Sequence, residues 1–118
     1  MTFQVFVHRL ARSDLSDAYA SACRHAPNTA DRWFDRFREA IRSLEVAPHQ
    51  CALAIESSKV NVEIRELHFG RRPNVFRVIF HIDSVTVRVL RIRRGQRRSL
   101  TRLQIAEAMK TDKPSEFE

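Results

Sequence analysis

The sequence predicts an α+β domain: an N-terminal strand, a two-helix hairpin packed on an antiparallel-dominated sheet of about four strands, and a short C-terminal helix. Three observations predict it. The N-terminal half has apolar residues at helical spacing, the C-terminal half has three strand-like runs, and no repeat or low-complexity segment interrupts them. A chain of 118 residues with 43% hydrophobic content can build one core. We therefore expect a single domain over residues 1–110, with 111–118 as a flexible tail.

The N-terminal half predicts one strand followed by two helices. Residues 3–8 alternate loosely between apolar and polar side chains, as a short strand does. Ser13 can cap a first helix whose apolar stripe runs from Leu15 to about Arg24. Thr29, or Asn28 before it, can cap a second helix. That helix keeps its apolar residues at helical spacing, and we expect them in the core: Ala30, Trp33, Phe34, Phe37, Ile41 and Leu44.

The C-terminal half predicts a long connection, three strands and a short helix. Residues 49–61 show no clear periodicity, so they are expected to form the connection. Residues 70–74 include a glycine and a proline and predict a turn between two strands. The three predicted strands and the final helix are Val62–Phe69, Val75–Ile82, Val85–Ile92 and Leu100–Met109.

The last two predicted strands indicate which side chains share a face. Treating Asp83-Ser84 as a two-residue hairpin loop places Ile82 opposite Val85. Continuing the ladder pairs Phe80 with Val87, Val78 with Val89 and Phe76 with Arg91. This face is nearly all apolar and is expected to pack on the helices. The other face, which we expect to be uncovered, carries Arg77, Ile79 and His81 against Thr86, Arg88 and Leu90.

Positive charge is concentrated late in the chain. The net charge is +7, yet residues 63–106 alone carry eleven basic and three acidic residues. No acidic residue occurs in 84–106, where seven arginines do, and such a patch attracts polyanions. Arginine also suits phosphate, because its planar fork donates two hydrogen bonds at once. The residues expected to bind nucleic acid or a partner are Arg88, Arg93, Arg94, Arg98 and Arg102.

The uncovered face also suggests a candidate site for RNA cleavage without a metal. Such a site needs a group that accepts the 2′-hydroxyl proton, a cation near the pentavalent phosphate and a proton donor to the leaving oxygen. Arg77 can supply the positive charge, and His81 or His68 titrates in the useful range. The alternatives stay open: Arg77 forms a structural salt bridge, and His81 is a strand residue with no catalytic role.

Several classes of protein receive no support. Cys23 and Cys51 form no C-x-x-C pair and have no histidine at zinc-ligand spacing, so we expect two buried, reduced thiols and no metal or other cofactor. The N-terminus lacks the features of a signal peptide, and no run approaches the roughly 20 apolar residues of a membrane span. We therefore expect a cytoplasmic protein that does not associate with membranes.

Four segments, in order, resemble the RelE/ParE superfamily of small basic toxins. Residues 64–70 (IRELHFG) with 75–80 (VFRVIF) are similar to its paired strands, and 87–97 (VRVLRIRRGQR) to its terminal strand and basic turn. Residues 32–44 are typical of its second helix. The resemblance spans about residues 3–103 and implies the RelE-like fold. It also implies a toxin from a bacterial type II toxin–antitoxin or plasmid stabilisation system.

The resemblance implies two alternative targets. In superfamily members that cleave mRNA on the ribosome, catalytic basic residues would correspond to Arg65, Arg77 and Arg97 here, and we add His81 from its position. Those enzymes also use a C-terminal tyrosine, where this chain has Leu103; its only tyrosine is Tyr19. ParE-like members instead inhibit DNA gyrase without such a set.

The sequence therefore leaves three hypotheses. The first two are a toxin that cleaves mRNA as a metal-independent endoribonuclease and a toxin that inhibits gyrase. The third is a non-catalytic RNA- or ribosome-binding module with the same fold. For either toxin the resemblance implies a cognate antitoxin that covers the basic sheet face in a hetero-oligomer. Residues 100–109 carry an apolar stripe that would pack on such a partner or on the toxin's own core.

Overall fold

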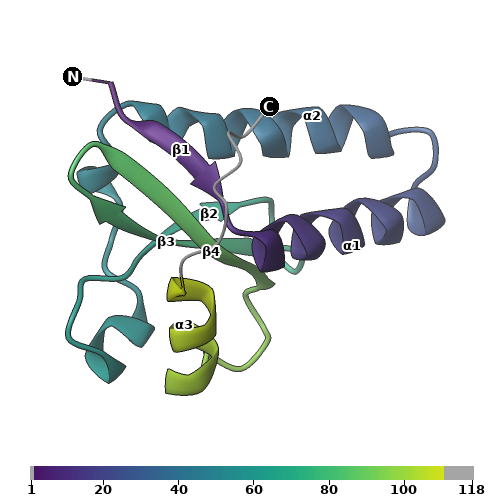
Figure 1. Ribbon diagram of the computed structural model, residues 1–118. Coiled ribbons are helices and arrows are strands. Elements are labelled where there is room, and N and C mark those ends of the chain that lie inside the picture. Colours follow the sequence, from purple (N-terminus) through teal and green to yellow (C-terminus); the bar gives the residue numbers. More distant parts are fainter. Residues whose placement is uncertain (1, 111–118) are drawn as a thin grey trace.

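A four-stranded mixed sheet with helices on both faces forms the centre of the molecule (Figure 1). This computed structural model describes residues 2–110, so the predicted tail 111–118 lies outside the described residues. The strand order is β1-β4-β3-β2, with β1 parallel to β4 and the other pairs antiparallel, which confirms the predicted fold class. The elements are β1 (Gln4–Val7), α1 (Arg9–His25), α2 (Ala30–Arg42), the 3₁₀ turns η1 (Ser43–Glu45), η2 (Pro48–Gln50) and η3 (Ile55–Lys59), β2 (Arg65–Phe69), β3 (Phe76–Asp83), β4 (Thr86–Arg94) and α3 (Arg102–Met109).

Helix α1 begins earlier than its apolar stripe predicted. It starts at Arg9, where His8 is the N-cap and its ring Nδ1 accepts a hydrogen bond from the Leu10 N–H at 3.1 Å. Ser13 is therefore inside the helix, and its prediction as the cap was wrong. Ala11 is buried, so the first turns are stabilised by tertiary packing that a stripe starting at Leu15 did not include.

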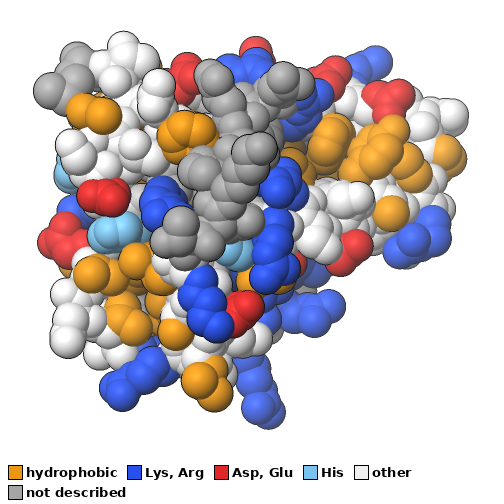
Figure 2. Space-filling model, in the orientation of Figure 1, with side chains coloured by type: hydrophobic (Ala, Val, Ile, Leu, Met, Phe, Trp, Pro, Cys, Tyr) orange, Lys and Arg blue, Asp and Glu red, His pale blue; other side chains and the backbone are white. Residues whose placement is uncertain are grey.

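The two long helices cover one face of the sheet, as predicted. Figure 2 shows hydrophobic side chains gathered where α1 and α2 lie side by side. Between the two helices the rings of Tyr19 and Phe34 are 4.7 Å apart, and on the sheet side Phe37 stacks on Phe69 at 4.5 Å. The main core below them combines both helices with three strands: Phe3, Val5, Val7, Ala11, Leu15, Ala18, Phe37, Ile41, Leu44, Phe76, Val78, Phe80, Val87, Val89 and Ile92.

The other face of the sheet is covered as well, and the expectation that it is bare was wrong. The turn η3 and helix α3 pack beneath the sheet (Figure 1). Ile79 and Leu90, which were assigned to the uncovered face, are both 0% exposed. Together with residues of α3 and of the segments that flank η3 and α3, they form a second core: Ala54, Ile64, Ile79, Leu90, Leu100, Ile105 and Ala108. The stripe in 100–109 thus packs mainly on the chain itself, although Leu103 is 83% exposed.

The hairpin between β3 and β4 keeps the predicted faces near its turn but not the predicted partners. Ile82 pairs with Val87 and not Val85, a two-residue shift that preserves the side of the sheet. The loop is Ser84-Val85, with Ser84 in the left-handed region at φ 58°. A bulge between Ile79 and Phe80 then changes the register again. Beyond it, Val78 lies opposite Ile92 and Phe76 opposite Arg94.

Cys23 and Cys51 are free thiols, and both are half-buried rather than buried. Burial raises the pKa of the Cys51 thiol above its usual value, and the nearby Arg65 opposes this only in part. Within residues 2–110, every helix is too short or too polar to cross a bilayer.

Candidate functional site

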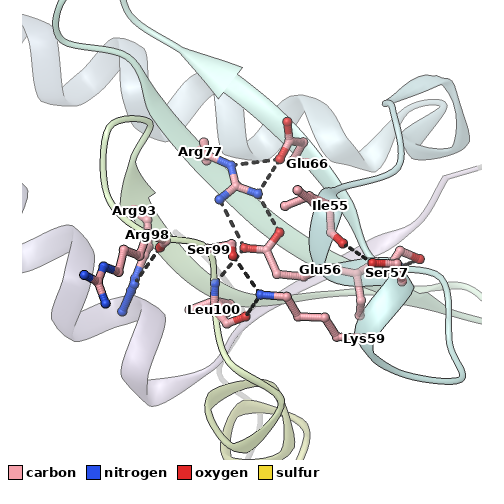
Figure 3. Close-up of polar contacts among 12 residues, drawn as sticks. Ile55, Glu56, Ser57, Lys59, Glu66, Arg77, Arg93, Arg98, Ser99 and Leu100 are labelled. Carbon is pink, nitrogen blue, oxygen red and sulfur yellow. Dashed lines mark hydrogen bonds and ion pairs between the residues drawn. The ribbon is translucent and has the colours of Figure 1, made fainter.

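Arg77 lies at the centre of a buried cluster of charges (Figure 3). Its side chain projects from β3 on the face opposite the long helices, and the residue is only 8% exposed. The guanidinium donates to Glu56 twice, from Nη1 at 3.1 Å and from Nη2 at 2.6 Å. It also donates to Glu66 Oε1, from Nε at 2.8 Å and from Nη2 at 2.5 Å. One arginine is thus held by two carboxylates, and it does not project from a bare surface as expected.

Glu56 connects this cluster to the C-terminal segment. Its carboxylate is wholly buried, and Oε2 also accepts the backbone N–H of Leu100 at 2.9 Å. Beside it, Lys59 Nζ donates to Ser99 Oγ and to the Leu100 carbonyl, each at 2.7 Å (Figure 3). Glu56 and Lys59 both belong to η3, in the long connection. These contacts hold the connection and the segment after β4 together beneath the sheet.

The cluster favours the charged forms of Glu56 and Arg77. Burial opposes ionisation of Glu56, but hydrogen bonds from Arg77 and from the Leu100 N–H outweigh it and hold the pKa of Glu56 below its usual value. Burial likewise opposes the charge on Arg77, and the bonds to Glu56 and Glu66 raise its pKa nevertheless. The positive charge of Arg77 is therefore compensated inside the protein.

A cavity of about 370 Å³ opens next to this cluster. It brings together His68, Arg77 and Arg97, three basic residues that are distant in the sequence. The His68 ring Nε2 lies 2.6 Å from Glu66 Oε2, so Glu66 bridges the histidine and Arg77. Arg97 is exposed and makes no ion pair with a carboxylate of residues 2–110.

Two of the four expected catalytic residues do not line this cavity. Arg65 Nη1 donates to the Cys51 carbonyl at 2.6 Å, and its Nη2 lies 3.3 Å from Glu63 Oε1. His81 Nδ1 lies 3.0 Å from the Glu63 carbonyl. The expected set of Arg65, Arg77, Arg97 and His81 is therefore divided: Arg77 and Arg97 share the cavity, whereas the other two anchor the chain before β2.

A second cavity, of about 450 Å³, lies between α1 and the end of β4. Strand β1 ends opposite Val89, so the last part of β4 lacks a neighbouring strand on that side. Asp14 of α1 fills this position: it accepts the Ile92 N–H at 2.9 Å and the Arg91 guanidinium at 2.7 and 2.9 Å. The bond to Asp14 raises the pKa of Arg91.

The expected binding arginines divide between this second cavity and other surfaces. Arg93 and Arg94 line it, and the Arg94 guanidinium lies 5.3 Å from the centre of the Phe76 ring. Arg98 is exposed, Arg102 donates to the Lys59 carbonyl at 3.2 Å, and Arg88 lies on β4 opposite His81. Of the seven arginines in residues 84–106, those that line this cavity are therefore the ones near the end of β4: Arg91, Arg93, Arg94 and Arg97.

Sequence reasoning missed Glu56, Lys59 and Ser99. The first two lie in a segment without periodicity, and no motif distinguishes them. The available signal was indirect. A strand arginine flanked by apolar residues on its own face, here Arg77 beside Ile79, needs a counter-charge if that face is covered.

Comparison with a solved structure defines the class of fold. A chain from the chromosomal ParDE TA system of P. aeruginosa matches with a TM-score of 0.63 and 24% identity, over 79% of this chain and 96% of that one. The fold is thus one found in a toxin–antitoxin system. The family model described as the ParE toxin of the type II toxin–antitoxin system, parDE, matches residues 5–99. The chain belongs to this family of toxins. No curated protein matches it.

Proposed function

We propose that this toxin inhibits DNA gyrase without catalysis and that a cognate antitoxin neutralises it. The observation that carries the proposal is the pairing of Arg77 with Glu56 and Glu66. In the superfamily that the chain resembles, Arg77 corresponds to a catalytic cation of the mRNA-cleaving members. Here two carboxylates already compensate its charge.

The chemistry of RNA cleavage explains why this pairing matters. A cation accelerates cleavage only if it stabilises the pentavalent phosphate more than the starting phosphodiester. Arg77 would have to leave Glu56 to do so, and breaking a buried pair costs about 3–5 kcal/mol. That cost would raise the barrier by a similar amount. A ParE-like toxin that acts by binding has no such requirement.

The C-terminal segment supports the same proposal. Leu103, which occupies the approximate position of the nuclease tyrosine, is 83% exposed on α3 and cannot transfer a proton. Tyr19 lies on α1 instead, where its hydroxyl donates to Asp31 Oδ1 at 2.5 Å. The bond to Asp31 raises the pKa of Tyr19. No tyrosine therefore serves the cavity beside Arg77.

The antitoxin is proposed on family membership and charge. The family is defined by a two-protein system, and the basic region 63–106 would attract an acidic segment. Binding of the antitoxin would then form a hetero-oligomer in which the toxin is inactive. Growth should be arrested when the chain is expressed alone and restored when its neighbouring small gene product is present.

The target is tested with the purified toxin. We expect inhibition of plasmid supercoiling by DNA gyrase and accumulation of gyrase-linked broken DNA, with cellular transcripts intact. Shortened transcripts with normal gyrase activity would refute the proposal. Unaffected growth in both expression experiments, from folded protein, would instead indicate the non-catalytic RNA- or ribosome-binding module.

A second candidate, metal-independent RNA cleavage, is favoured by one observation. The same cavity holds His68, paired with Glu66, and the exposed Arg97. A histidine oriented by a carboxylate can act as a general base, and Arg97 retains a free charge. On this hypothesis His68→Gln and Arg97→Ala abolish cleavage and leave the melting temperature unchanged. Equal transcript cleavage by both variants and the parent toxin would eliminate it.

A further inference from the structure

The cavity between α1 and the end of β4 has an unusual charge balance. Its volume is about 450 Å³, comparable with small-ligand sites. Five arginines and two aspartates line it, so its lining carries a net charge of +3. The arginines are Arg24 on α1 and Arg91, Arg93, Arg94 and Arg97 on or directly after β4.

Only one of these arginines is neutralised within the described chain. Asp14 binds Arg91 through two hydrogen bonds. Arg93 and Arg94 each donate one bond to an uncharged acceptor, the Arg98 carbonyl and the Asn74 side chain, both at 3.2 Å. For Arg24 and Arg97, the chain from 2 to 110 supplies no carboxylate partner.

We infer that this cavity binds the phosphodiester group of a nucleic acid. A carboxylate is satisfied by a single guanidinium fork, as Asp14 is by Arg91. A phosphodiester also has two charged oxygens, but they project from a tetrahedral phosphorus rather than lying in one plane with a single fork, so they can accept from forks that approach from two sides. Here Arg24 lines the cavity from α1, and Arg93 and Arg97 line it from the end of β4 and the turn after it. Phosphate chemistry therefore fits this arrangement better than an acidic peptide does.

The crowding of the arginines supports this site. Burial lowers the pKa of Arg93, and the neighbouring charges of Arg91 and Arg97 lower it further, with only partial compensation from Asp14. A bound anion would relieve this repulsion. Because Arg97 lines both cavities, whereas Arg24 lines this one and not the cavity beside Arg77, Arg24 is the more selective residue to change.

The inference goes beyond gyrase inhibition, because the toxin would contact nucleic acid itself. It is tested by fluorescence anisotropy with a labelled duplex DNA of about 12 base pairs and a single-stranded RNA of about 12 nucleotides, across a range of salt concentrations. We expect Arg24→Gln and Arg97→Gln each to weaken binding by about five- to tenfold. Each should also reduce the salt slope by about 0.9 on the duplex or about 0.7 on the single strand.

The matched control is Arg32→Gln, which removes the same charge from the exposed surface of α2, outside this cavity. Its affinity should stay within twofold of the parent. Binding of both probes supports a backbone phosphate in general, and binding of one probe identifies the nucleic acid. Two results would overturn the inference: no binding by the parent, or an equal loss in Arg32→Gln. The assay contains no gyrase, so its failure leaves the target proposal intact.

Discussion

Removing the Glu56 carboxylate tests whether the Arg77 cluster is structural. In Glu56→Ala, Arg77 stays buried but keeps Glu66, so we take the lower end of the range for a broken buried pair, about 3 kcal/mol. The Leu100 N–H also loses its acceptor, which adds about 1 kcal/mol. The expected loss is therefore about 4 kcal/mol.

Thermal and urea unfolding followed by circular dichroism measure this loss. For a chain of this length roughly 4 °C corresponds to 1 kcal/mol, so the melting temperature should fall by about 16 °C. The control is Glu63→Ala. Glu63 is exposed, and its Oε1 lies 3.3 Å from Arg65 Nη2. Ion pairs of this kind at the surface contribute about 0–1 kcal/mol to the free energy of unfolding.

The stability of Glu56→Ala decides what a loss of toxicity in Arg77→Ala means. If the free energy of unfolding of Glu56→Ala lies within about 1 kcal/mol of the parent's, the cluster does not stabilise the fold, and Arg77 can leave Glu56 for a bound phosphate at little cost. If the loss is as large as expected, inactivity of Arg77→Ala is not evidence of catalysis, because that variant leaves two buried carboxylates without their cation. His68→Gln and Arg97→Ala are then the informative variants.

Three further predictions concern stability. The pKa of Glu56 is lower in the folded state than in the unfolded state, where it is about 4.3. The stability that its ionised carboxylate contributes is therefore present above about pH 4.3 and is lost as the pH falls through the folded pKa. Between pH 6 and 3 the urea midpoint of Glu56→Gln should therefore decline less than that of the parent. Asp14→Ala should cost about 2 kcal/mol, because Arg91 and the Ile92 N–H lose their acceptor; a urea midpoint equal to the parent's would contradict this. Phe37→Ala should cost about 3–5 kcal/mol, since Phe37 is fully buried under α2, and a melting temperature within 4 °C of the parent's would count against that packing.

The elements themselves were largely predictable from the sequence. The apolar spacing of α2 is a local pattern with one solution that buries its apolar residues, and the sequence of β3 places Val78, Phe80 and Ile82 on one face by simple alternation. The start of α1 was not predictable in the same way, because the cap is a histidine, His8, and the first turns depend on packing of Ala11.

The alternation of side chains does not by itself set the register between β3 and β4. Alternation fixes which side of a strand is apolar, and a two-residue shift leaves that side unchanged. Both the predicted and the observed partners of Ile82 satisfy it. The choice depends on backbone conformation, here Ser84 in the left-handed region, and on the bulge after Ile79.

The candidate site depended on contacts between distant segments. The sequence by itself determined the fold class, the helix-facing side of the sheet and the concentration of arginine late in the chain. Only the tertiary structure decided that Glu56, 21 residues from Arg77, neutralises it, and that Arg24 and Arg93 line the same cavity. The physical reason is that periodicity reports which side of an element is buried, whereas the counter-charge of a buried arginine is set by which loop covers that side.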